Sequence, residues 1–270
     1  MKDEIDPYLK GTKLYGDDFS EAEIKAWYES EKQGYHDIYE KDYVRPPYGY
    51  HLFNNQFGFD LLPVKRLHHT LGFGAGNGDE LQAVINKCDQ ITILDPTDSY
   101  VSKKVGSTSI SYARPQTNGK LMFNNNTFDL ICCFSALHHV PNVSFVLKEF
   151  YRCLTPGGHL ILREPVISMG NWRKPRKGLT RNERGIPIRL FDEAISRTGF
   201  KVINRKHVLF SLLPRLAKLL KVKDPYNHSF FISADRLLCH LTKWNKNYHA
   251  TSSLQKIRPV AMAYVLEKAL

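Results

Sequence analysis

The stretch Leu71–Gly78, with the sequence LGFGAGNG, is the feature that most constrains how this chain folds. It follows a short apolar-leaning run, and Asp95 lies seventeen residues beyond Gly78, directly after Gln90–Leu94. We expect a strand, a glycine-rich turn, a helix and a second strand that ends in a carboxylate. Such a unit binds a nucleotide-like ligand, because glycines let the backbone come close and the carboxylate accepts hydrogen bonds from ribose hydroxyls.

Strand-like and helix-like segments alternate from about residue 67 to residue 165. The expected strands are Leu67–Phe73, Gln90–Leu94, Ser109–Ala113, Phe128–Phe134, His159–Arg163, Lys201–Leu209 and Pro259–Leu266, and the expected helices are Asp79–Lys87, Val143–Cys153 and Phe191–Thr198. Alternation of this kind indicates a parallel sheet with right-handed crossovers. We therefore predict an α/β fold with a doubly wound, mostly parallel seven-stranded sheet and an antiparallel last strand.

Three regions of different character divide the chain. Ser20 and Glu23 form a capping-box pattern, which predicts a helix to about Lys32 that Gly34 ends. The prolines and glycine of Tyr43–Asn55 favour a loop. We expect an N-terminal helical and loop lid at residues 1–60, a core formed by 61–210 and 258–270, and a helical cap at 211–257 inserted in the final hairpin.

Length and cysteine content limit the class of protein. With 270 residues, of which 42% are hydrophobic, the chain can bury one sizeable core. Its five cysteines are an odd number in mostly apolar surroundings, and no CxxC pair or Cys/His ligand cluster is visible. We expect reduced thiols, a cytoplasmic protein and no metal site. The charged start does not resemble a secretory signal. The sequence contains no apolar run of about 18 residues, so we expect no membrane span.

The positive charge of the chain is concentrated. The formal net charge is +11, and residues 172–189 hold seven Lys or Arg against Glu183 alone, a local +6. A concentrated basic loop suggests an anionic partner. The alternative is a solvated loop whose charges lie in water.

The glycine turn alone leaves NAD, FAD and S-adenosylmethionine open as ligands, because its spacing is G-x-G-x-G rather than G-x-G-x-x-G. Two later motifs narrow the choice: FDLICCFSALHHVPN at residues 128–142 and LTPGGHLIL at residues 154–162. With these motifs in this order, the chain resembles the class I S-adenosylmethionine-dependent methyltransferases, in their small-molecule, methyltransferase type 11-like branch. The resemblance covers roughly residues 65 to 205.

The resemblance implies a set of residues that bind S-adenosyl-L-methionine. It places Gly74, Ala75, Gly76 and Gly78 around the methionine and ribose, Asp95 on the ribose diol, Pro96 and Thr97 beside the adenine, and Phe134 and Ser135 beside the sulfonium. The alternative for Asp95 is a helix N-cap. Gly72 occupies a position where the family often has a carboxylate, and Glu80 is a candidate substitute.

Candidate catalytic and acceptor-binding residues follow the fourth and fifth strands. His138, His139 and Glu164 are candidate bases, against structural alternatives in which a histidine packs under the loop and Glu164 forms a salt bridge. The candidate substrate-binding residues are Arg163, Trp172, Arg173, Arg176, Arg181 and Arg184. Arginines of this kind hold phosphate or carboxylate groups by bidentate contacts.

We therefore expect methyl transfer to a small polar, anionic or polyhydroxylated acceptor, most plausibly O-methylation of a sugar or polysaccharide precursor. One alternative is an RNA or DNA methyltransferase, although Arg45 occupies the acidic or amide position of the related amino-methylation motif before Pro46-Pro47-Tyr48. Another is a non-catalytic protein that binds the cofactor. The basic amphipathic stretch 209–223 either contacts an anionic membrane or packs into the cap. The sequence does not determine the oligomeric state.

Overall fold

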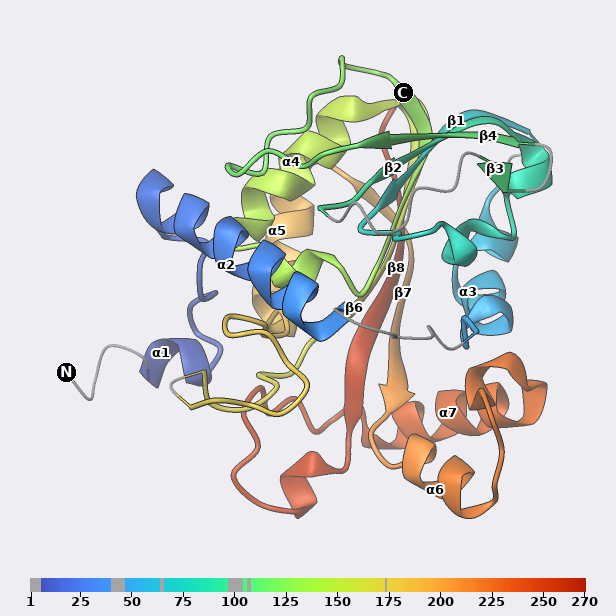
Figure 1. The fold of residues 1–270 in the computed structure, drawn as a ribbon. Coiled ribbons are helices and arrows are strands. Elements are labelled where there is room, and N and C mark those ends of the chain that lie inside the picture. The colour runs from blue at the N-terminus through green and yellow to red at the C-terminus, as the bar shows by residue number, and fades with distance from the viewer. Residues whose placement is uncertain (1–5, 40–46, 64–65, 97–103, 106–107, 173) are drawn as a thin grey trace.

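The computed structural model describes residues 6–39, 47–63, 66–96, 104–105, 108–172 and 174–270. Its centre is an eight-stranded sheet with the order β3-β4-β2-β1-β5-β6-β8-β7 (Figure 1). The strands are β1 Leu67–Phe73, β2 Cys88–Leu94, β3 Lys104–Val105, β4 Thr108–Ala113, β5 Phe128–Phe134, β6 Leu154–Pro165, β7 Lys201–Phe210 and β8 Pro259–Glu267. Strand β8 is antiparallel to both β6 and β7, whereas the pairs among β4, β2, β1, β5 and β6 are parallel. The predicted fold is confirmed, with β3 as an additional two-residue edge strand.

The helices lie around this sheet. The α-helices are α1 Asp6–Leu9, α2 Glu21–Tyr39, α3 His51–Phe57, α4 Val143–Cys153, α5 Ile188–Thr198, α6 Leu213–Leu219 and α7 Ser229–Thr242. Short 3-10 turns are η1 Phe59–Leu61, η2 Asp79–Leu81, η3 Ile85–Lys87, η4 Leu137–His139, η5 Pro225–Asn227 and η6 Leu254–Lys256. Within the described residues, none of these helices is long and apolar enough to span a bilayer.

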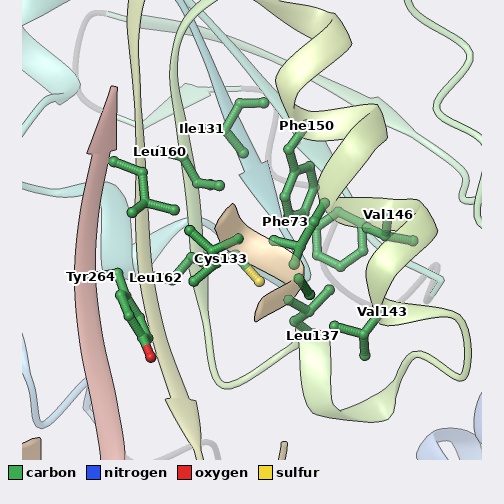
Figure 2. Packing of buried hydrophobic residues seen from close by; sticks show 14 of the residues in the cluster. Phe73, Ile131, Cys133, Leu137, Val143, Val146, Phe150, Leu160, Leu162 and Tyr264 are labelled. Atoms are coloured by element: carbon green, nitrogen blue, oxygen red, sulfur yellow. The ribbon is translucent and has the colours of Figure 1, made fainter. Parts of the chain in front are cut away.

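Helices α4 and α5 cover one face of the sheet. Figure 2 shows side chains of α4, such as Val146 and Phe150, packed against strand residues that include Ile131 and Leu160. The other face is covered by η2 and η3 and by α3, and α3 also shares a cluster with α6, α7 and the adjoining ends of β7 and β8. The sheet is therefore buried on both faces, which leaves its strand ends as the place for a ligand.

The connection from β1 to β2 differs from the expectation of one helix at Asp79–Lys87. It consists of the separate turns η2 and η3, held by bonds from Leu81 N to Gly78 O and from Val84 N to Leu81 O. The connection must run back along the full length of a strand before β2 can start parallel to β1. Seven strand residues span about 23 Å, but nine α-helical residues would cover only about 14 Å of that distance. The 3-10 turns rise about 2.0 Å per residue and so reach further with the same number of residues.

The N-terminal region contains more helix than expected. Ser20 and Glu23 form the expected capping box, in which the Ser20 amide donates to Glu23 Oε2 at 2.8 Å. Helix α2 nevertheless continues through Gly34, whose missing side chain leaves room for Thr180. Within the expected loop, α3 forms because Phe53 and Phe57, four residues apart, stack at 4.5 Å and bury against the sheet. In α2, tertiary packing thus outweighs the free-energy cost of about 1 kcal/mol that a glycine such as Gly34 brings to the interior of a helix.

Candidate cofactor and acceptor site

A cavity of about 420 Å³ lies at the carboxyl ends of the parallel strands, between the sheet and the N-terminal region. Its walls come from the ends of β1, β2, β5 and β6, from α2, and from the segment before α3. The residues from the sheet side are Phe73, Gly74, Gly76, Glu80, Leu94, Asp95, Pro96, Pro115, Phe134, Ser135, Ala136, His139, Val140, Arg163 and Leu209. The residues from the N-terminal side are Tyr28, Glu31, Lys32, Pro47, Tyr48, Gly49 and Tyr50.

The glycine turn forms the floor of the cavity. Gly74 has φ +66°, and a Cβ at this position would lie 2.4 Å from Ala136 Cβ, so only glycine fits. The Gly76 amide donates to Asp95 Oδ2 at 3.0 Å, which joins the turn to the carboxylate after β2. Ala75 is buried, and Gly78 has φ +85° and packs near Ile93, so neither borders the cavity. A backbone cradle beside a carboxylate is what a ribose-bearing cofactor requires.

Gly72 is explained by packing. A Cβ there would lie 2.7 Å from Ala75 Cβ and 2.9 Å from Leu81 Cδ1, so the carboxylate that the family often carries has no room. Glu80, on η2, is 6% exposed and borders the cavity. It therefore supplies a negative charge close to the place where Gly72 lacks one.

The end of β5 also fits a ligand site. Phe134 borders the cavity, and Ser135 has φ +58°, an unfavourable conformation for a residue other than glycine. The Ser135 amide donates to Arg163 O at 2.8 Å, which fixes this turn to the end of β6. Strained residues of this kind are concentrated at functional sites. Thr97, the remaining predicted cofactor contact, lies outside the described residues.

Arg163 is a buried cation in the cavity wall. It is 4% exposed, its Nη2 donates to the Tyr48 hydroxyl at 3.1 Å, and its guanidinium lies 4.1 Å from the centre of the Tyr50 ring. Its Nε has no hydrogen-bond partner among the described residues. A buried guanidinium with bonding capacity left over is suited to hold an anionic or strongly polar ligand group.

His139 reaches the same cavity from the turn after β5. Its Nδ1 lies 2.9 Å from Glu31 Oε2, and the Thr180 hydroxyl donates to the same oxygen at 2.6 Å. Burial, followed by the neighbouring His138, lowers the pKa of His139, so the ring is neutral at pH 7. A carboxylate on Nδ1 selects the tautomer in which Nε2 can accept a proton. His139 therefore has the protonation state of a general base.

His138 and Glu164 lie under this turn and do not border the cavity. Glu164 is fully buried and accepts hydrogen bonds from the backbone amides of Ala136, Leu137 and His138 and from His138 Nδ1. Successive side chains of a strand point to opposite faces, so Arg163 reaches the cavity and Glu164 points toward the α4 side. This geometry makes Glu164 an anchor of the turn rather than a group that meets an acceptor.

His138, His139 and Glu183 bring potential metal-ligand atoms within 4.8 Å of one another. Each histidine already has a carboxylate neighbour, since His138 lies between Glu164 at 2.9 Å and Glu183 at 3.5 Å, and His139 bonds to Glu31. The group therefore forms a network of hydrogen bonds and close carboxylate contacts, and it links the turn after β5 to the basic loop.

The basic loop does not face the cavity. Arg184 is fully buried and donates to the carbonyls of Tyr15, His138, Val140 and Pro141. Arg176 donates to carbonyls of its own loop at Met169, Thr180, Arg181 and Glu183. Trp172 stacks on Tyr15 at 5.1 Å, Arg181 is exposed, and Arg173 lies outside the described residues. Among the predicted substrate-binding residues that the structure describes, only Arg163 borders the cavity, because the other arginines there bind backbone carbonyls or extend into solvent.

Two residues of α2 that border the cavity were not predicted. Tyr28 and Lys32 lie on the same helix face as Glu31, because residues three and four apart are neighbours on a helix. The sequence shows this spacing but gives no sign that the face meets the strand ends. Tyr48 and Tyr50 belong to residues 1–60, the region that the sequence predicts as a lid.

Comparison with known proteins agrees with this site. Residues 71–162 match the family described as methyltransferase domain. The chain is 28% identical, over 43% of its length and 50% of the relative, to the ubiquinone/menaquinone biosynthesis C-methyltransferase UbiE of Psychromonas ingrahamii. It therefore spans about half the length of the curated relatives that it matches.

Solved structures show the same fold. An S-adenosylmethionine-dependent methyltransferase of Mesorhizobium loti superimposes with a TM-score of 0.51 at 18% identity, over 77% of this chain and 94% of that one. The [4+2]-cyclase SpnF superimposes with a TM-score of 0.56 at 15% identity, over 93% and 97%. Residues 71–162 thus match a methyltransferase domain, and the strand order and the cavity at the strand ends agree with that match. The match implies S-adenosylmethionine as the cofactor of this domain.

Proposed function

We propose that the protein transfers the methyl group of S-adenosylmethionine to a small acceptor that carries an anionic or strongly polar group next to the methylated position. One observation carries the proposal: a single cavity contains the glycine cradle with Asp95 and also the buried Arg163 and His139. The first set suits the cofactor and the second suits an acceptor. The bound cofactor supplies an electrophilic methyl group on a sulfonium.

The residues of the chain act on binding and alignment. Asp95 accepts hydrogen bonds from the ribose hydroxyls, and Glu80 serves the cationic amino group of the methionine part. Arg163 binds the anionic or polar group of the acceptor, and the rings of Tyr48 and Tyr50 exclude water around it. Held in this way, the acceptor atom meets the methyl group without a large entropic cost at the moment of reaction.

His139 acts as the base for a hydroxyl acceptor, with Glu31 orienting it. A neutral imidazole can take the hydroxyl proton, which favours O-methylation. The sugar or polysaccharide precursor expected from the basic loop loses much of its support, since Arg176 and Arg184 bind backbone carbonyls. The aromatic walls Tyr28, Tyr48 and Phe134 favour an acceptor with a flat or apolar ring.

Carbon methylation of a quinone-like ring is a second candidate. The aromatic cavity walls favour it, as does the similarity to a protein named a ubiquinone/menaquinone biosynthesis C-methyltransferase. The position of the labelled methyl group in the product, read by NMR, separates the two. A methyl carbon bonded to oxygen supports O-methylation, and one bonded to ring carbon supports the second candidate.

Cofactor binding is tested by thermal shift with S-adenosylhomocysteine, NAD and FAD. Ligand at about 100 times its dissociation constant should stabilise the fold by roughly 2.7 kcal/mol. We expect this response for S-adenosylhomocysteine alone, and we expect Asp95→Ala to abolish it. The control Asp60→Ala removes an exposed carboxylate elsewhere and should leave the response unchanged. A larger shift with NAD would contradict the assignment.

Acceptor binding is tested with Arg163→Gln. The KM for the acceptor should rise by roughly 10-fold to 100-fold, because hydrogen bonds to charged groups contribute about 1.5–3 kcal/mol. Binding of S-adenosylhomocysteine should be unchanged. Loss of cofactor binding with an unchanged acceptor KM would instead place Arg163 on the carboxylate of the cofactor.

We also propose that residues 1–60 close the cavity as a lid and that 211–257 form a cap on the core formed by 61–210 and 258–270. The lid is supported by Glu31, Tyr48 and Tyr50 in the cavity wall. The cap is supported by the position of α6 and α7 between β7 and β8. A cytoplasmic location is supported by five cysteines that are all free and buried.

A further inference from the structure

We propose that the cap docks on a membrane surface that carries anionic phospholipids. The surface is made by exposed side chains of α6, α7 and the turns around them, and we call it the cap face. Its apolar members are Leu216, Leu219, Leu220, Phe230, Leu237, Leu241, Trp244 and Leu254. The proposal does not depend on the reaction that the cavity catalyses.

The apolar side chains of the cap face are concentrated and highly exposed. Leu219 is 81% exposed, Phe230 75% and Trp244 68%. Of the fourteen large hydrophobic residues that are exposed among the described residues, eight lie within the 47 residues of the cap. Exposed apolar side chains concentrated in one segment in this way indicate an interaction surface rather than ordinary surface composition.

Helix α7 has two apolar faces. Phe231, Ile232 and Cys239 are buried and pack in the cluster with α3 and the end of β7. Phe230, Leu237 and Leu241 follow at intervals of seven and four residues, which places them together on the opposite, exposed face. An apolar face exposed opposite a buried one is the pattern of an interaction surface, since a helix that meets only water on its outer side is normally polar there.

The charge around the cap face selects the occupant. Residues 211–257 hold eight Lys or Arg and two acidic residues, a net charge of +6. Asp235, one of the two, is fully buried and accepts from the amides of Leu209 and Phe210. Beside Leu237 lies a groove of about 630 Å³ that contains the cations Arg236 and Lys243, a combination of cations and apolar edge that fits a phosphate headgroup above its acyl chains.

A second copy of the chain fits this charge poorly. A two-fold dimer through the cap face would bring two net-positive caps against each other, and like charges across an interface cost several kcal/mol. An anionic bilayer instead accepts leucine, phenylalanine and tryptophan into its interface and attracts the lysines and arginines around them. The cap segment also adjoins the cavity wall, because the buried Tyr226 of η5 stacks on Tyr50 at 5.1 Å.

The test is co-sedimentation of the full chain with vesicles of phosphatidylcholine alone and of equal phosphatidylcholine and phosphatidylglycerol. We expect binding to the anionic vesicles only. The triple variant Arg236→Gln, Lys243→Gln, Lys246→Gln should bind roughly 100-fold more weakly, since each basic residue near an anionic surface contributes about fivefold. The control Lys148→Gln, Arg197→Gln removes two exposed charges of α4 and α5, outside the cap, and should bind as the wild type does.

Tryptophan fluorescence gives an independent readout. Trp27 and Trp172 are buried at 2% and 8% exposure, so a blue shift on adding anionic vesicles reports Trp244. Phe230→Ser with Leu241→Ser should weaken binding at least about tenfold, and Met122→Ser, an exposed apolar residue outside the cap, should not. Equal binding of all variants, or no binding by the wild type, would overturn the proposal. So would a dimer, or RNA binding, that the cap variants abolish while vesicle binding is absent.

Discussion

The basic loop at 172–189 and the cap at 211–257 each carry a net charge of +6, yet the fold uses the two charges differently. In the loop, Arg176 and Arg184 donate to backbone carbonyls, and Arg184 is fully buried. In the cap, the lysines and arginines are exposed around an apolar face, as Arg236 and Lys243 are beside Leu237.

The difference shows that a local charge count does not reveal a ligand. A guanidinium that uses four of its five donors on carbonyls holds chain segments together and cannot also bind an anion by a bidentate contact. An exposed ammonium keeps its field in solution and can attract an anionic surface. The predicted basic substrate loop is thus a structural element, and the exposed charges that an anionic partner could meet lie in the cap.

The largest effect is expected for Arg184→Met. The substitution removes the donor from the buried carbonyls of His138, Val140 and Pro141 and from the part-buried carbonyl of Tyr15. Unsatisfied buried polar groups of this number should lower the free energy of unfolding by about 3–5 kcal/mol. Urea unfolding measures the change, and Arg181→Met, at an exposed position, is the control. Equal stability of the two variants would show that the loop charges are not structural.

A smaller loss is expected for Arg176→Ala. This guanidinium donates to carbonyls at Met169 and Glu183 but lies partly exposed, so water can replace some of its bonds. We expect a loss of about 1–2 kcal/mol in urea unfolding. A higher KM for the acceptor with unchanged stability would instead show that Arg176 takes part in substrate binding.

The pH dependence of stability should differ in sign between the two histidines. Burial alone would lower the pKa of His138, but its bonds to Glu164 and Glu183 raise it above 6.5. The stability that this gives is complete below about pH 6.5 and is lost as the pH rises through the raised pKa. The pKa of His139 is lowered, so its contribution is complete above about pH 6.5 and is lost as the pH falls.

Urea unfolding from about pH 5 to about pH 9 tests this sign. The advantage of the wild type over His138→Gln should shrink as the pH rises, and its advantage over His139→Gln should shrink as the pH falls. Two differences that change in the same direction would contradict the assigned shifts.

The smallest effect is expected in the cap. Arg236→Gln with Lys243→Gln should change the free energy of unfolding by less than about 0.5 kcal/mol, because exposed substitutions rarely do more. The same protein should lose vesicle binding. A stability loss as large as that of Arg176→Ala would show that the cap charges, like those of the loop, hold the fold together.

The strand pattern and the cofactor motifs were accessible from the sequence. Strand Leu67–Phe73 and helix Val143–Cys153 begin and end where their periodicity predicts. Such elements are buried, and burial imposes a regular pattern. The two 3-10 turns and the continuation of α2 through Gly34 were not accessible, since they depend on the length of the connection and on contact with Thr180.

The sequence by itself predicted the kind of domain. The glycine turn, Asp95 and the later motifs are local patterns, and a local pattern can be read from consecutive residues. Only the tertiary structure decided which charged side chains border the cavity. It directed Arg163 into the cavity and Glu164 beneath the turn after β5, and it used Arg184 to hold three distant segments together. Neighbours in sequence received opposite roles because strand geometry and packing, not composition, decide what each side chain meets.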